Sequence, residues 1–203
     1  MKKLKRVIWL QSIYKDKVLK KTEAISPASN LWQYNLIKNL KNKNIKILSI
    51  GHYFEPAWPK GKFFISTKKN DIVKDFEFKT INYINLPFLR NIFLFFKYLK
   101  ILIFLSYKKG DMILAYNRSV VTNVTRIINK IKLIPYLAIS ADLKYPKKAD
   151  GYVFLSWNYF KKTKIKQPKF FLDGGIDKFS YKNIKNNKKN KNKIILYSGI
   201  IGV

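Results

Sequence analysis

The chain has 203 residues, of which 42 are Lys or Arg and 11 are Asp or Glu, so its formal net charge is +31. This length allows one α/β domain with little left for a second, and the 47% hydrophobic content excludes a globally disordered chain. The absence of cysteine excludes disulfides, thiolate metal sites and cysteine nucleophiles, and a single histidine, His52, argues against a histidine-ligated metal.

The positive charge comes almost entirely from lysine, because only Arg6, Arg90, Arg118 and Arg126 are arginine. Lysine, asparagine and isoleucine have AT-rich codons, so a biased genome is one explanation of the charge. Attraction to anionic membrane surfaces is the second. Nucleic-acid binding is the weakest of the three, since sequence-specific DNA readers rely on arginine for bidentate base contacts.

No secretory signal or membrane span is predicted. The apolar stretch 7–10 that follows the basic start is too short for a signal peptide. The most apolar segment, 92–107, is short for a membrane span and contains Lys97 and Lys100. We therefore expect a cytoplasmic protein, with peripheral contact to the inner face of the membrane as an open alternative.

The start of the chain predicts a strand, a helix and a second strand, the unit of parallel sheets. Residues 7–14 are apolar and rich in β-branched and aromatic side chains, and residues 45–50 form a similar short segment. A polar connection, residues 15–25, leads to Ser26 and Pro27, an N-cap followed by a proline in the first helical turn. Apolar residues then recur at helical spacing.

The next part of the chain predicts a loop, a strand and an apolar helix. Residues 53–62 contain two prolines, a glycine and several aromatic side chains, which argues against regular structure. A third strand is expected at 78–86, closed by Pro87. Residues 91–107 predict a mostly apolar helix with a narrow polar stripe. Two interpretations of it stay open: a buried crossover helix, or a helix inserted at a membrane interface.

The second half of the chain continues the alternation. Residues 111–116 predict a strand, 119–131 a helix and 133–139 another strand. Two further apolar strands are expected at 152–155 and 170–172. The pattern predicts an α/β fold with a Rossmann-like, mainly parallel sheet and helices on both faces.

The most specific pattern runs from Asp150 to Asp177. It consists of an aspartate, an apolar strand, Ser156, a short basic helix, and a strand that runs into Asp173-Gly174-Gly175-Ile176-Asp177. This order resembles the end of the N-terminal, acceptor-side domain of GT-B fold glycosyltransferases of the family 4 type (group 1). That family usually has an asparagine where this chain has Gly174. The family also often has a glycine pair after the first strand, whereas no glycine here precedes Gly51.

The resemblance implies a domain organisation. Residues 1–180 would form the Rossmann-like acceptor-side domain, the N-terminal half of a GT-B fold. Residues 181–193 contain six lysines and no acidic residue, which predicts a solvated linker. Residues 194–203 would be the first strand of a missing C-terminal donor-binding domain. We therefore expect a truncated enzyme that lacks its donor site.

The function implied by the resemblance is that of a retaining glycosyltransferase in cell-surface polysaccharide synthesis. Such an enzyme moves a sugar from a nucleotide-sugar donor to a glycan or lipid-linked acceptor. The resemblance implies no bound cofactor and no metal; the nucleotide-sugar is the donor substrate.

Candidate site residues lie at the carboxyl ends of the predicted strands, where parallel sheets bind ligands. The acceptor-binding candidates follow the second, fourth and sixth strands: His52, Glu55, Trp58, Asn117, Arg118 and Ser156. Asp142, after the fifth strand, could orient an acceptor hydroxyl as a general base, or could be a helix N-cap. The donor-binding or hinge candidates come from the last turn and strand: Gly174, Gly175, Asp177 and Gly199. A packed core histidine and a surface arginine remain the alternatives for His52 and Arg118.

Two other functions stay open. One is a non-catalytic acceptor-binding subunit that pairs with a separate donor-domain chain. The other is a basic protein that binds a membrane surface, or less favourably nucleic acid, through the lysine-rich segment 181–193.

Overall fold

The computed structural model describes residues 4–19, 26–68, 71–73, 75–116, 119–141 and 148–172. The internal contacts divide the chain into two units, Met1–Asp173 and Gly174–Val203. All described residues belong to the first unit, so the predicted linker 181–193 and the strand expected at 194–203 lie outside them.

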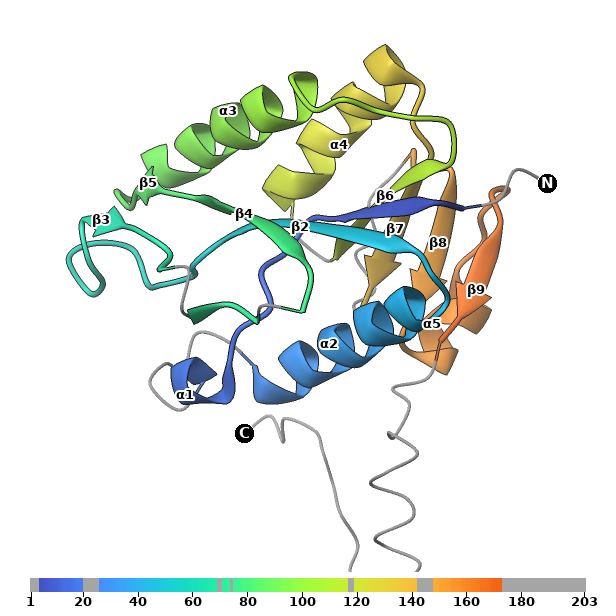
Figure 1. Ribbon diagram of the computed structural model, residues 1–203, viewed down its shortest axis with the longest axis horizontal. Helices are drawn as coiled ribbons and strands as arrows, with labels where there is room; N and C mark the ends of the chain where they lie inside the picture. Colours follow the sequence, from blue (N-terminus) through green and yellow to red (C-terminus); the bar gives the residue numbers. More distant parts are fainter. Residues whose placement is uncertain are drawn as a thin grey trace, which may run out of the picture. The chain divides into compact units, whose positions relative to one another are not determined.

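Seven parallel strands form one sheet in the order β4-β2-β1-β6-β7-β8-β9 (Figure 1). They are β1 (Arg6–Trp9), β2 (Lys46–His52), β4 (Glu77–Ile81), β6 (Asp111–Tyr116), β7 (Tyr136–Ser140), β8 (Gly151–Phe154) and β9 (Lys169–Phe171). The chain moves from β1 toward one edge of the sheet and from β6 toward the other, as in doubly wound Rossmann-like folds. The α/β fold predicted from the sequence is confirmed, and each of its seven predicted strands overlaps a strand of this sheet.

Two strands end earlier than the sequence pattern predicts. β1 ends at Trp9, although apolar residues continue beyond it. The predicted strand 78–86 is divided: its first part is β4, whereas β5 (Tyr83–Ile84) pairs antiparallel with β3 (Phe64–Ile65) in a separate two-stranded ribbon. Apolar composition does not show where a chain leaves its sheet, because the residues after the departure can be equally buried.

Helices cover both faces of the sheet. They are α1 (Asp16–Leu19), α2 (Pro27–Asn42), α3 (Leu89–Ile103), α4 (Ser119–Lys132) and α5 (Trp157–Lys162). α2 lies on one face, and α3 and α4 pack together on the other (Figure 1). Ser26 is the N-cap of α2 as predicted, and its hydroxyl oxygen accepts a hydrogen bond from the Ser29 N–H at 3.3 Å. α1 is a short turn of helix within the predicted polar connection 15–25.

β1 lies at the centre of the core. Val7, Ile8 and Trp9 are completely buried. Ile8 belongs to the apolar cluster that includes α3 and α4, whereas Val7 and Trp9 belong to the cluster under α2. A strand covered on both faces needs apolar residues at every position, which explains the uninterrupted apolar sequence of β1.

The carboxyl ends of β1 and β2 approach closely at Gly51. A Cβ on Gly51 would lie 2.3 Å from the backbone nitrogen of Ser12 and 2.7 Å from the carbonyl carbon of Gln11. Gly151, at the start of β8, differs, because its Cβ would first meet a methyl group of Leu137, at 2.6 Å. A methyl at the end of a side chain can rotate away, whereas backbone held between strands cannot.

Gly51→Ala should therefore lower the free energy of unfolding by about 1–3 kcal/mol, the range of overpacked cores. Gly151→Ala is the matched control and should lower it by less. Urea unfolding of both variants and the wild type measures the difference. Equal losses in the two variants would show that the contact between Gly51 and the chain after β1 is not tight.

Tyr136, the first residue of β7, is completely buried, and this burial raises the pKa of its hydroxyl to about 12. In the unfolded chain a tyrosine titrates near pH 10. The unfolded state therefore loses this proton first as the pH rises, so the contribution of Tyr136 to stability is complete below pH 10 and is lost between pH 10 and pH 12.

Tyr136→Phe should make the loss of unfolding free energy between pH 10 and pH 12 shallower, by up to about 1.4 kcal/mol per pH unit. Urea unfolding at pH 9, 10, 11 and 12 measures this slope. Tyr159→Phe, at a partly exposed tyrosine of α5, serves as the control. A Tyr136→Phe variant that keeps the wild-type slope would contradict the expectation.

Candidate functional site

The sheet has its topological switch point between β1 and β6. After β1 the chain continues to α2 and β2 on one side, and after β6 it continues to α4 and β7 on the other. The two connections leave in opposite directions, which in doubly wound folds creates a crevice at the carboxyl ends of the strands. This edge of the sheet is therefore the expected place for a ligand.

Gln11 and Ser12 follow β1 at this edge. The Ser49 hydroxyl of β2 donates a hydrogen bond to the Gln11 carbonyl oxygen, and Gly51 packs directly against Ser12. Two side-chain oxygens, Gln11 Oε1 and Ser12 Oγ, are buried without a hydrogen-bond partner among the described residues. Buried polar atoms in folded proteins normally have a partner, so a ligand or a water molecule is expected beside them.

The first two turns of α2 contact the end of β6. Gln33 Nε2 donates to the Ser29 Oγ at 3.1 Å, and the Ser29 hydroxyl donates to the Tyr116 hydroxyl at 3.2 Å. The rings of Trp32 and Tyr116 pack with their centroids 5.9 Å apart. Gln33 Oε1 is a third buried oxygen that finds no partner in the described part of the chain. We refer to Gln11, Ser12, Ser29, Gln33 and Tyr116 as the switch-point cluster.

The chemistry of the three unpartnered oxygens limits what this cluster can bind. An amide oxygen only accepts hydrogen bonds, so Gln11 and Gln33 need a partner that donates, either a water molecule or a donor group of a ligand. Sugar hydroxyls donate, whereas ionised phosphate and carboxylate groups do not. Each buried oxygen left without a partner costs about 1–3 kcal/mol. The cluster therefore favours a hydroxyl-rich ligand over an anion.

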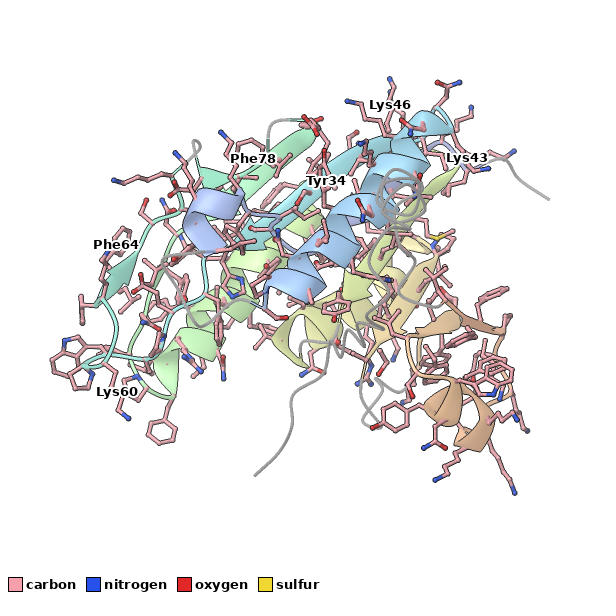
Figure 2. The ribbon with its side chains drawn as sticks, turned by 90° about the horizontal axis from the view of Figure 1, so that it is seen from below. Tyr34, Lys43, Lys46, Lys60, Phe64 and Phe78 are labelled. Atoms are coloured by element: carbon pink, nitrogen blue, oxygen red, sulfur yellow. The ribbon has the colours of Figure 1, made fainter. Side chains whose placement is uncertain are left out.

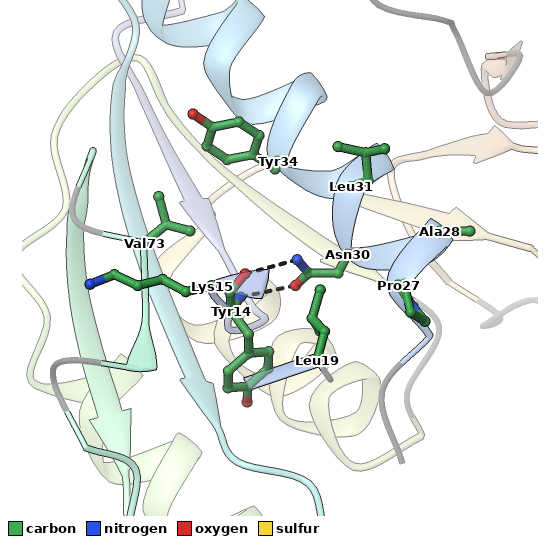
Figure 3. A pocket seen from close by; sticks show the side chains of 9 residues that line it. All are labelled: Tyr14, Lys15, Leu19, Pro27, Ala28, Asn30, Leu31, Tyr34 and Val73. Atoms are coloured by element: carbon green, nitrogen blue, oxygen red, sulfur yellow. Dashed lines mark hydrogen bonds between the residues drawn. The ribbon is translucent and has the colours of Figure 1, made fainter. Parts of the chain in front are cut away.

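A pocket of about 600 Å³ lies between the chain that follows β1 and the start of α2 (Figure 3). Its lining comes from these two segments and the connection before β4: Tyr14, Lys15, Leu19, Pro27, Ala28, Asn30, Leu31, Tyr34 and Val73. Asn30 Oδ1 accepts the Tyr14 N–H at 2.9 Å, and Asn30 Nδ2 donates to the Tyr14 carbonyl oxygen at 3.0 Å. These two hydrogen bonds join the two walls of the pocket.

The pocket lining is mainly apolar, with few polar groups. Lys15 is the one cationic side chain of the described lining. The Tyr34 hydroxyl donates to Asp75 Oδ2 at 2.8 Å. The pKa of Tyr34 is raised, first by this hydrogen bond and then by burial and the charge of Asp75. A volume and lining of this kind suit a small organic ligand.

Three predicted acceptor-binding residues lie in or after the end of β2. His52 is buried, and its Nδ1 lies 2.9 Å from the Tyr98 hydroxyl. Glu55 Oε2 accepts the Lys62 N–H at 3.1 Å and so closes the following loop. Trp58, in that loop, is 47% exposed. In this arrangement His52 packs within the core, while Trp58 is accessible from outside.

Ser156 lies apart from these three residues. It follows β8, which is four strands from β2, a separation of about 19 Å along the edge at 4.8 Å per strand. Ser156 is the N-cap of α5, although its side chain makes no capping hydrogen bond. The other candidates lie outside the described residues: Asn117, Arg118, Asp142, Gly174, Gly175, Asp177 and Gly199.

The sequence pattern does not single out Gln11, Ser12 or Gln33. Gln11 and Ser12 lie within the apolar run 7–14, and Gln33 lies within a predicted helix. The sequence does contain a feature that could have drawn attention to each of them. A polar Gln-Ser pair interrupts an otherwise apolar segment, and Gln33 shares the buried face of α2 with Ile37.

No described helix is both long and apolar enough to cross a bilayer, and no three acidic or histidine side chains of the described ranges gather as ligands for a metal ion. No family model matches the chain, nor does any curated protein or solved structure. The chemistry of the switch-point cluster and of the adjoining pocket is therefore the basis for a function.

Asn30→Ala removes both hydrogen bonds to the Tyr14 backbone. The free energy of unfolding should fall by about 1–3 kcal/mol, since Asn30 and Tyr14 are both buried. Asn39→Ala, on the exposed side of the same helix, should change it by less than about 0.5 kcal/mol. Urea unfolding of the two variants is the measurement. A small, equal effect would show that Asn30 does not hold the pocket walls together.

Proposed function

We propose that this chain is the acceptor-side domain of a GT-B-type glycosyltransferase and that the switch-point cluster binds its carbohydrate acceptor. The observation that carries the proposal is the set of three buried oxygens, on Gln11, Ser12 and Gln33, without partners among the described residues. The doubly wound sheet supports it, because ligands of such sheets bind at the switch point. The pattern of residues 150–177 supplies the resemblance to the glycosyltransferase family.

A sugar suits both parts of the site. Its hydroxyls can donate to the oxygens of the switch-point cluster. The pocket, which shares the first turns of α2 with the cluster, offers Leu31 and Tyr34 as apolar and aromatic surface for a ring face. Lys15 at the same pocket could pair with an anionic group on the acceptor, such as the phosphate of a lipid-linked sugar.

The described part of the site would bind and orient the acceptor. Neither residues 10–15 nor residues 26–34 contain a carboxylate, so this part supplies no general base. In the proposed enzyme a second domain binds the nucleotide-sugar donor, and the transfer retains the configuration of the sugar. Asp142, the predicted base, follows β7 outside the described residues.

The lack of a carboxylate in these segments also favours a second candidate function. This is a non-catalytic subunit that binds the acceptor and pairs with a separate donor-binding chain. The two candidates share the carbohydrate site and differ in whether this chain itself takes part in sugar transfer.

Gln11→Leu keeps the approximate size of the side chain and removes its acceptor oxygen. If a sugar hydroxyl donates to Gln11, the Kd for glycan ligands should rise about tenfold, since one hydrogen bond contributes about 1.4 kcal/mol. Gln167→Leu, at an exposed position before β9, should bind as the wild type does. Calorimetry and ligand-observed NMR with a panel of neutral oligosaccharides and lipid-linked sugars give the Kd values.

Two results would contradict the carbohydrate site: no binding of any glycan by the wild-type chain, or the same Kd for the wild type and Gln11→Leu. A transfer assay with labelled nucleotide-sugars then separates the two candidates. Transfer by this chain supports the enzyme, whereas glycan binding that yields transfer only after a donor-binding chain is added supports the subunit.

A further inference from the structure

We propose that one exposed surface of this protein docks onto an anionic lipid bilayer. The surface, called here the aromatic edge, is formed by large apolar side chains of the loop before β3, of β3, and of the start of α3: Trp58, Phe63, Phe64, Phe88, Ile92 and Phe96. None of these residues belongs to the switch-point cluster or its pocket, so this proposal stands independently of the proposed carbohydrate site.

Asn85 holds the two segments of the aromatic edge together. Its N–H donates to the Phe63 carbonyl oxygen at 2.7 Å, and its carbonyl oxygen accepts the Trp58 N–H at 3.0 Å. Asn85 Nδ2 donates to the carbonyl oxygens of Pro56, at 2.6 Å, and Lys62, at 3.0 Å. Figure 1 shows β3, β5 and the start of α3 at the same end of the sheet. The loop is therefore tied to the segment that leads into α3, and both lie at the same end of the sheet.

α3 is apolar on two opposite sides. Leu94, Tyr98 and Leu102 are buried against the sheet and its neighbours. Ile92 and Phe96, on the outer side, are 52% and 62% exposed. A helix with apolar residues on two opposite sides is normally covered on both, but the described chain covers only the inner side of α3. An outer apolar face of this kind marks an interaction surface.

Phe88 is the most exposed large apolar side chain of the described residues, at 91%. It is the N-cap of α3, with φ 63° and ψ −49° and no side-chain capping bond. A residue with a bulky side chain is strained at this combination of positive φ and negative ψ. Little packing within the described chain covers the phenyl ring of Phe88, so the ring is accessible to an apolar medium outside the protein.

The charges around the aromatic edge favour an anionic bilayer as its partner. Lys60, Lys97 and Lys100 are exposed beside it, and neither residues 56–68 nor residues 78–110 contain an acidic side chain. A second copy of this chain would present the same cations and be repelled, whereas anionic headgroups attract them. Aromatic side chains bordered by lysine are typical of surfaces that lie in a membrane interface.

The position of the aromatic edge fits a docked orientation. The loop 53–63 follows the carboxyl end of β2, and α3 begins after β4 and β5. In Figure 2, Lys60 and Phe64 lie at one end of the described unit, and Lys43 and Lys46, near the amino end of β2, lie toward the other. Docking through the aromatic edge would therefore bring the carboxyl edge of the sheet, where the ligand site is, toward the lipid surface.

Vesicle co-sedimentation tests the proposal with single and double variants. Phe88→Ser combined with Phe96→Ser should weaken binding to vesicles of phosphatidylcholine with 30% phosphatidylglycerol by about 10-fold or more, since two large apolar contacts are lost. Phe170→Ser is the matched control, because Phe170 is 56% exposed in β9, at the opposite edge of the sheet. It should bind within about 2-fold of the wild type.

A second measurement uses a variant that keeps an aromatic side chain at every position of the aromatic edge. Vesicles whose acyl chains carry bromine quench tryptophan that enters the bilayer, so they should quench the wild type more than Trp58→Phe. Exposed Trp157, at the other edge of the sheet, gives the control variant Trp157→Phe, whose fluorescence should be quenched by at least as large a fraction as that of the wild type.

Several outcomes would overturn the proposal. If the Phe88 and Phe96 double variant binds as the wild type does and 0.5 M salt removes all binding, the association is the general attraction of a basic chain. If Phe170→Ser weakens vesicle binding as much as the double variant does, binding does not depend specifically on the aromatic edge. If the wild type forms dimers, and Phe96→Ser abolishes them without changing vesicle binding, the surface serves self-association and not membrane docking.

Discussion

The central strand β1 is the constraint on which the rest of the structure depends. It has a parallel partner on each side, β2 and β6, and Val7, Ile8 and Trp9 have no exposed surface on either face. At its amino end the Arg6 guanidinium pairs with the buried carboxylate of Asp111, which begins β6. With both edges paired and both faces covered, β1 determines where α2 packs on one face and α3 and α4 on the other.

The same strand places the candidate ligand site. β1 leaves the sheet at its carboxyl end between β2 and β6, so the side-chain oxygens of Gln11 and Ser12 are buried beside strand ends and not within the hydrogen-bond ladder. Gly51 allows the chain of β2 to come close enough to enclose them. The resulting site has acceptor oxygens without partners among the described residues. This chemistry fits a ligand rich in hydroxyl groups and makes a carbohydrate more suitable than a bare anion.

The aromatic edge suggests a role for part of the strong positive charge. Lysines distributed over a whole surface point to no particular partner, and a biased genome is one explanation of them. The lysines beside exposed Phe88 and Phe96 lie in a region without acidic side chains. There, apolar contact and positive charge would both favour binding of the same surface to an anionic bilayer. Because this surface lies at the carboxyl edge of the sheet, membrane contact and acceptor binding would occur on the same side of the protein, which suits an acceptor anchored in lipid.

The sequence by itself determined the elements of the fold, because hydrophobic periodicity and capping residues act locally. The seven strands and the Ser26–Pro27 start of α2 could be predicted for this reason. The strand order, the early end of β1 and the pairing of β5 with β3 were decided only by the tertiary structure, since they depend on contacts between segments far apart in the chain. The two interpretations of the apolar helix show the limit most clearly. Its composition is compatible with a core helix or a membrane-facing one, and only packing against the sheet shows that Tyr98 faces inward while Phe96 faces outward.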